Sequence, residues 1–175
     1  MLAADALREI AAGDTALAFD AMRALRTHYE DEAQFVRRVD EVQRPEGYRI
    51  VGAFGDDGRC LAVAGFRELN NLAWGHVVYV DDLSTHPDGR RQGYGRALLE
   101  WCAAEAKRLG CDALHLDSGV EANRLDAHRL YLNTGMRITS FHFAKPIGAQ
   151  PAEPAASAKA IGAQPAEPAA SAKPL

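Results

Sequence analysis

The sequence contains few cysteines and no long hydrophobic run. Its three cysteines, Cys60, Cys102 and Cys111, are odd in number and lack the spacing of metal ligands. We therefore expect a reduced, cytoplasmic setting and no bound metal. No stretch offers the roughly 20 apolar residues that a membrane span needs. Residues 1–20 also lack the basic and apolar regions of a signal peptide, so neither membrane insertion nor secretion is expected.

A surplus of positive charge is also missing. The formal net charge is −4, which argues against a general nucleic-acid-binding protein. The chain has no glycine-rich loop ending in Gly-Lys-Ser or Gly-Lys-Thr, so nucleotide hydrolysis by a P-loop is disfavoured. Apolar residues make up 47% of the chain and charged residues 25%, as in ordinary globular proteins. A length of 175 residues is enough for one domain with a substantial core.

Hydrophobic periodicity predicts an ordered succession of helices and strands. The expected elements are helices at 14–25 and 30–43, strands at 48–54, 59–69 and 74–84, a helix ending at 109–110, a strand at 112–117, a helix at 125–134, and one or two strands at 136–144. Composition also favours a helix at residues 1–13. This order predicts an α/β (α+β) domain in which helices flank a mixed, mostly antiparallel sheet.

The last thirty residues differ in composition from the rest. Residues 147–159 recur unaltered as 161–173, and both copies are rich in proline and alanine. Such a segment has too few bulky apolar side chains to offset the entropy cost of ordering. We therefore predict a domain at 1–145 and a disordered tail at 146–175.

A glycine-bearing loop follows the third predicted strand. Residues 90–96 read Arg-Arg-Gln-Gly-Tyr-Gly-Arg and precede a predicted helix. Backbone N–H groups at a helix N-terminus bind phosphate, and glycine lets the backbone approach the ligand closely. The loop therefore predicts a phosphate site. Taken on its own, however, the loop is better explained as a surface turn with basic, solvated side chains.

Three blocks in order give the sequence a family resemblance. The first is Leu83-Ser84-Thr85-His86-Pro87 followed by Arg90-x-x-Gly93-x-Gly95, and the second is Ala97-Leu98-Leu99. The third is Ala127-His128-Arg129-Leu130-Tyr131, followed by Gly135-Met136. Together they resemble the GCN5-related N-acetyltransferase (GNAT) superfamily, whose members transfer an acyl group from acyl-coenzyme A to an amine.

The resemblance covers about residues 43–145, and it implies a GNAT-like fold whose first strand lies at 6–10 rather than a helix. It implies acetyl-coenzyme A (acetyl-CoA) as co-substrate and direct attack by an amine in a ternary complex. The residues it implies for the cofactor are Leu83, Ser84, Thr85, Arg90, Arg91, Gln92, Gly93, Tyr94, Gly95, Arg96 and Asn123. Within this set, the N–H of Leu83 is the candidate donor to the oxyanion. Asn123 departs from the family's spacing by one position, which leaves Arg124 as its rival.

The catalytic residues implied by the resemblance are Tyr131 and Asp82. Tyr131 corresponds to the tyrosine that protonates the leaving thiolate, and Asp82 is the candidate general base. Strand alternation predicts that Asp81 and Asp82 point to opposite faces of the sheet. Other residues stay open as candidates for the base: Glu68, His76, His115 and His142.

The acceptor cannot be assigned from the sequence, and both a small-molecule amine and a protein amine fit. Polar residues of the first helices could contact it, namely Arg23, Arg26, Glu30 and Asp31. The resemblance also allows a homodimer. A second hypothesis, from another class, is a non-catalytic acyl-CoA-sensing module on the same fold. Neither hypothesis calls for nucleic acid or a membrane as a partner.

Overall fold

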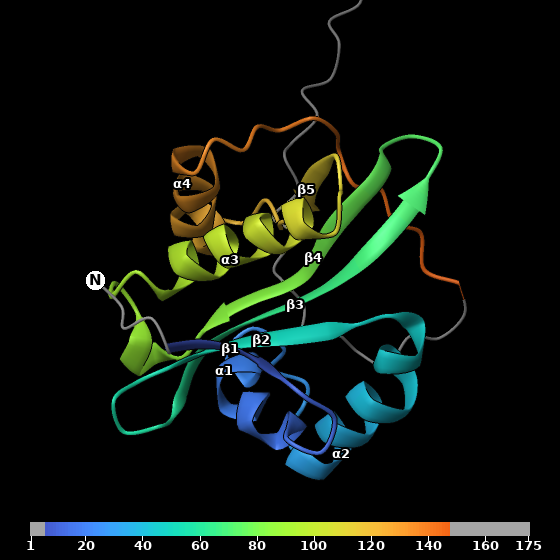
Figure 1. Cartoon of the computed structure of the whole chain (residues 1–175). Helices are drawn as coiled ribbons and strands as arrows, with labels where there is room; N and C mark the ends of the chain where they lie inside the picture. Colours follow the sequence, from blue (N-terminus) through green and yellow to red (C-terminus); the bar gives the residue numbers. More distant parts are fainter. Residues whose placement is uncertain (1–5, 148–175) are drawn as a thin grey trace, which may run out of the picture. The chain divides into compact units, whose positions relative to one another are not determined.

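The computed structural model describes residues 6–147, and its centre is a five-stranded sheet in the order β1-β2-β3-β4-β5 (Figure 1). The strands are β1 (Leu7–Ile10), β2 (Arg49–Phe54), β3 (Cys60–Asn71), β4 (Gly75–Thr85) and β5 (Ala113–Leu116). The first four strands pair antiparallel with their neighbours, whereas β5 runs parallel to β4. The predicted mixed, mostly antiparallel sheet is therefore confirmed.

Helices cover both faces of this sheet (Figure 1). One face carries α1 (Phe19–Arg23) and α2 (Glu32–Arg37), and the other carries α3 (Tyr94–Arg108) and α4 (Leu125–Asn133). Shorter turns of helix connect them: 3-10 helices at Thr15–Ala18, Arg44–Glu46, Pro87–Gly89 and Ala122–Arg124, and a π-helix at Arg38–Gln43. None of the helices in residues 6–147 has the length and apolar character needed to cross a membrane.

Two hydrophobic cores lie on the two faces of the sheet. Successive side chains of β2 point to opposite faces, so Ile50 packs with α1 and α2 while Val51 packs beneath α3. β3 divides in the same way, with Val63 on the first face and Ala64 on the second. Burial on both faces explains why the central strands are almost continuously apolar.

A β-bulge interrupts β4 opposite Gly65 and Phe66. Gly65 pairs with Asp82 and Phe66 pairs with Val80, which leaves Asp81 as an extra residue. Val80 and Leu83 consequently pack on the same α3 face, although they are three residues apart. The bulge reorients the side chains at the carboxyl end of this strand.

The carboxyl end of β4 also extends beyond its neighbour. β5 pairs with β4 only along Val77–Val80, whereas β3 stays paired with β4 as far as Thr85. No strand within residues 6–147 pairs with the β5 side of residues 81–85, so this side is an open strand edge. It lies directly before the glycine loop.

Two expectations about strands had opposite outcomes. The first strand implied by the resemblance is confirmed by β1, and the helix favoured by composition is wrong there. The predicted strands at 136–144 are also wrong, because the structure describes no strand between 134 and 147. In this segment Ile138, Phe141 and Phe143 are more than four-fifths exposed, so the alternating pattern has no surface on which to bury its apolar side.

The compact unit ends at Lys145, and most of the predicted tail, 148–175, lies outside the described residues.

Candidate active site

The glycine loop presents an uncapped helix N-terminus to solvent. Gly93 is the N-cap residue of α3 and adopts a left-handed conformation, with φ of 88°. No side chain in the described part of the chain caps α3, so the first N–H groups of the helix can donate to a ligand. Arg91 also has a positive φ, 61°, which is unusual for a residue with a side chain. An uncapped helix N-terminus of this kind is suited to binding an anion.

The two glycines of the loop serve different purposes. A Cβ at Gly93 would meet no atom within 4 Å, so it is the left-handed backbone that requires glycine there. At Gly95 a Cβ would lie 3.2 Å from Leu130 Cδ2, so this glycine lets α3 pack closely against α4. These requirements of the fold stand beside the expectation that both glycines let the backbone approach phosphate.

Three residues predicted to bind the cofactor direct their side chains into the protein. Leu83 packs with the core beneath α3, and Tyr94 is buried in the same core. The Ser84 hydroxyl donates a hydrogen bond of 2.5 Å to the carbonyl of Ala21 in α1. Ser84 and Tyr94 are buried and would therefore meet a ligand through their backbone groups, whereas Leu83 is only partly buried.

The polar side chains of the loop lie on the surface. Arg90 and Arg91 are exposed, while Gln92 donates to the carbonyl of Asp88 at 2.7 Å. Arg96 lies 3.9 Å from the Glu100 carboxylate one turn along α3. The three arginines belong to the loop and to the first turn of α3, so they add positive charge near this helix N-terminus.

Tyr131 is a buried residue of α4. It is 8% exposed, and burial raises the pKa of its hydroxyl, although nearby Arg124 and Ser118 act in the opposite direction. The buried Ser118 hydroxyl therefore lies close to the Tyr131 hydroxyl. Asn123 is exposed, so of the two rivals it is Arg124 that lies near Tyr131.

A polar pocket of about 260 Å³ opens on the other face of the sheet. Residues from the first helices, the π-helix and strands β3 and β4 line it: Met22, Arg26, His28, Tyr29, Phe35, Arg38, Val39, Gln43, Tyr48, Arg67, Asp81 and Asp82. Of the four polar candidates from the first helices, Arg26 alone is in this set. The pocket reaches β4 at its bulge.

Asp82 binds two partners in this pocket. Its Oδ1 accepts from Arg26 Nε at 2.6 Å, and its Oδ2 accepts from the Tyr48 hydroxyl at 2.6 Å. The Tyr48 ring crosses Gly65, where a Cβ would lie 1.7 Å from the hydroxyl oxygen. Burial, followed by the charge of Asp82, raises the pKa of Tyr48 well above its ordinary value, so this phenol stays a hydrogen-bond donor.

Asp81 faces the same pocket, which corrects the prediction from strand alternation. The bulge adds one residue to β4, so neighbouring carboxylates that a regular strand would separate now share a cavity. Asp81 accepts from Arg67 Nε at 3.0 Å, and Arg67 also donates to Gln43 at 2.8 Å. Burial raises the pKa of Asp81, and its bond with Arg67 offsets part of that shift.

The rival bases lie outside the pocket. Glu68 and His76 bond to each other, His115 stacks on Trp74, and His142 pairs with Asp117. Sequence reasoning missed Tyr48 and Arg67 as pocket residues. Gly65 was the available clue, because a glycine inside a strand often marks close approach by another group.

The sheet, the open edge of β4 and the uncapped N-terminus of α3 form an α/β domain that can hold an extended, phosphate-bearing ligand. The sequence pattern of the Acetyltransferase (GNAT) family matches residues 15–136. The chain belongs to this family and is an acetyltransferase. GNAT enzymes use acetyl-CoA as co-substrate.

Named relatives agree with this assignment. The chain is 29% identical over 127 residues to the uncharacterized N-acetyltransferase YhdJ of Bacillus subtilis, covering 72% of this chain and 87% of that protein. It is 34% identical over 79 residues to an aminoalkylphosphonate N-acetyltransferase of Salmonella typhimurium, covering 45% and 49% of the two chains. Both relatives are N-acetyltransferases by name, which supports acetyl transfer to nitrogen.

Solved structures show the same fold. A ribosomal-protein-alanine N-acetyltransferase of Brucella melitensis aligns with a TM-score of 0.69 at 16% identity, covering 81% of this chain and 99% of its own. A Trypanosoma brucei acetyltransferase aligns with a TM-score of 0.65 at 19% identity, covering 81% and 98%. At these identities the likeness concerns the fold alone.

Proposed function

We propose that the protein transfers the acetyl group of acetyl-CoA to a primary amine by direct attack in a ternary complex. The observation that carries this proposal is the carboxyl end of β4. On one side it has an open edge beside the N-terminus of α3, and on the other its bulge reaches a polar pocket. Two reactants entering from these two sides would meet at residues 81–85.

The α3 side has the features needed for coenzyme A. The N–H groups at the start of α3, with Arg90, Arg91 and Arg96, would hold the pyrophosphate. The backbone of residues 83–85 would pair with the extended arm of the cofactor as a further strand does. Acetyl-CoA supplies an activated acetyl thioester when bound. The Leu83 N–H would donate to its carbonyl oxygen as negative charge develops there.

Tyr131 is the proposed general acid. Because burial raises its pKa, the phenol keeps its proton at neutral pH and can donate it to the departing sulfur. The buried Ser118 hydroxyl lies beside it and can help to orient the phenol.

Asp82 is the proposed base for the acceptor ammonium. Its carboxylate oxygens already bond Arg26 and Tyr48, but each carboxylate oxygen has room for a second hydrogen bond. Asp81 shares the pocket and can act with it through water. The two carboxylates would attract a positively charged amine to the bulge.

We further propose that the acceptor is a small amine bearing an acidic group. Arg26 and Arg67 pair with carboxylates, whereas Arg38 has no ion pair among residues 6–147. This guanidinium on the π-helix can bind a carboxylate, phosphate or phosphonate. The relative that acts on an aminoalkylphosphonate fits such an acceptor. A protein amine is the alternative, and the modest size of the pocket makes it the weaker one.

An acceptor panel with acetyl-CoA tests the function. Free thiol release is followed with an aminoalkylphosphonate, an amino acid, an uncharged primary amine and a peptide N-terminus. We expect turnover with the acidic small amines. Tight acetyl-CoA binding without turnover on any amine would instead favour a sensing module.

Replacement of Gly93 tests the cofactor site. Valine there must adopt a left-handed backbone or displace the helix N-terminus, so Gly93→Val should weaken acetyl-CoA binding at least about tenfold. Gly13→Val is the matched control, since Gly13 also has a positive φ, 92°, and free space around it. Equal affinities of the two variants in calorimetry would contradict the assignment of the loop.

Loss of the Tyr131 hydroxyl tests the general acid. We expect Tyr131→Phe to lower kcat by up to about 100-fold, because a thiolate is already a fair leaving group. The Kd of acetyl-CoA should hardly change. A large loss of affinity with normal kcat would mean that Tyr131 binds the cofactor and does not donate a proton.

A further inference from the structure

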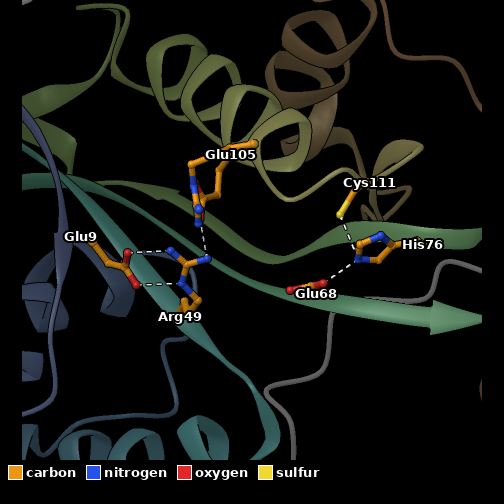
Figure 2. A network of polar contacts seen from close by, with 7 residues as sticks. Glu9, Arg49, Glu68, His76, Glu105 and Cys111 are labelled. Carbon is orange, nitrogen blue, oxygen red and sulfur yellow. Dashed lines mark hydrogen bonds and ion pairs between the residues drawn. The ribbon is translucent and has the colours of Figure 1, made fainter.

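Three side chains that can bind metal meet at the opposite end of β4 from the pocket (Figure 2). Glu68 comes from β3, His76 from β4, and Cys111 from the link between α3 and β5. His76 Nε2 lies 2.5 Å from Glu68 Oε1 and 3.4 Å from Cys111 Sγ. All three potential ligand atoms lie within 4.8 Å of one another.

We propose that Glu68, His76 and Cys111 form a binding site for a divalent transition-metal ion of the zinc class. Thiolate, imidazole and carboxylate are the three protein ligands that Zn²⁺ accepts, at about 2.0–2.3 Å from the ion. Such a mixed set is poorly suited to Mg²⁺ or Ca²⁺, which prefer oxygen ligands. Three protein ligands leave the fourth tetrahedral position to solvent.

The backbone holds two of these ligands in place independently of any metal. α3 ends in a Schellman motif: Gly110 has a φ of 74°, and Cys111 N–H donates to the carbonyl of Ala106 at 2.9 Å. The next N–H, of Asp112, donates to the carbonyl of His76 at 2.7 Å. The cysteine is therefore tied to the strand that carries the histidine, and the site is largely preorganised.

The surroundings of the sulfur favour a cation. The carboxylates of Glu68, Asp112 and Glu105 lie near enough to the Cys111 thiol to act on it electrostatically. A group of negative charges that discourages a thiolate attracts a metal ion, whose own charge then stabilises the thiolate. Cys111 also lines a surface hollow of about 300 Å³, and the Glu68 side chain is about half exposed, so an ion can enter.

The place of the site in the fold indicates a structural role. His76 precedes Asp82 by six residues on β4, which separates them by about 20 Å along the strand. A metal at this distance would not take part in acetyl transfer. It would join the distal ends of β3 and β4 to the C-terminus of α3. The sequence did not suggest this site, because its ligands come from three elements rather than from one cysteine-rich motif.

Cobalt titration of the untagged full chain tests the proposal directly, because tetrahedral Co²⁺ reports a thiolate ligand by an intense charge-transfer absorption. We expect one Co²⁺ per chain with this absorption, and displacement by Zn²⁺. Cys111→Ser should lose the absorption and weaken Zn²⁺ binding at least about 100-fold, more than loss of an outer-shell partner does. His76→Gln removes a second ligand and should also weaken Zn²⁺ binding. Its matched control is His142→Gln, because His142 also pairs with a carboxylate but lies outside the cluster.

Absence of Co²⁺ binding, or binding without thiolate absorption, would overturn the proposal. Equal affinity of Cys111→Ser and the natural chain would do the same. Alkylation adds a test that needs no variant. Bound Zn²⁺ should lower the rate at which a thiol reagent modifies Cys111 at least tenfold. Cys60 and Cys102 are buried and should stay unmodified in the native protein with or without the ion.

Discussion

Two arginine–carboxylate networks lie on opposite faces of the sheet, and the pKa values of their carboxyl groups are shifted in opposite directions. On the α3 face, Glu105 accepts from Arg49 at 2.6 Å and from Arg108 at 2.7 Å, and these bonds lower its pKa to about 2 (Figure 2). On the α1 face, Asp81 accepts from Arg67 at 3.0 Å, yet burial raises its pKa. The same chemical groups therefore give a more acidic carboxyl at Glu105 and a more basic carboxyl at Asp81.

The two networks also differ in how many of their donors are engaged. Arg49 donates to both oxygens of Glu9 and to Glu105, so one guanidinium joins β1, β2 and α3. In the pocket, Arg26 stays 44% exposed and Arg38 lies unpaired among the described residues. A network whose donors are all engaged stabilises the fold, whereas one with free donors beside a cavity can bind a ligand.

The largest effect is expected where the pocket network depends on a glycine. A methyl group at Gly65 would overlap the Tyr48 hydroxyl, so Gly65→Ala must displace the Tyr48 ring from Asp82. We expect a loss of about 1–3 kcal/mol in the free energy of unfolding. Loss of positioning should also lower kcat/KM about 100-fold. Urea denaturation and steady-state kinetics measure the two effects.

Tyr48→Phe is the control for this prediction. It keeps the ring above Gly65 and removes only the bond to Asp82, so it should lower kcat/KM by a smaller factor, about tenfold. If Gly65→Ala retained full activity, the Tyr48–Asp82 contact would have no part in acceptor binding or proton transfer.

A smaller and more selective effect is expected at the unpaired donor. Arg38→Gln should raise the KM for an acidic amine about tenfold, since it removes a charge-assisted hydrogen bond. The KM for an uncharged amine should stay the same. Arg37→Gln is the matched control, because Arg37 is an exposed neighbour that does not line the pocket. A uniform change for both amines would mean that Arg38 shapes the pocket without recognising an acid.

The contrast between the two faces also shows what a sequence reveals. The glycine loop was predictable because its backbone conformation requires particular residues within one short stretch. The left-handed conformation at position 93, for example, favours glycine. The pocket was largely hidden, because Tyr48, Arg67 and Asp81 meet only through sheet register and a bulge. Strand alternation put Asp81 and Asp82 on opposite faces, and no pattern in the sequence marks the extra residue that brings them together.

The smallest effect is expected in the network that only stabilises. The pKa of Glu105 is lowered on folding, so its ion pairs stabilise the native state above the unfolded pKa, about 4.3. This contribution is lost as the pH falls toward 2. Glu105→Gln should therefore cost about 1 kcal/mol at neutral pH, with the gap to the natural protein closing between about pH 5 and pH 2. Unfolding free energies across this range measure the gap, and acetyl transfer at pH 7 should be unaffected. A gap that stays constant with pH would show that the variant acts through packing, because only a charge that titrates in this range can make the difference disappear.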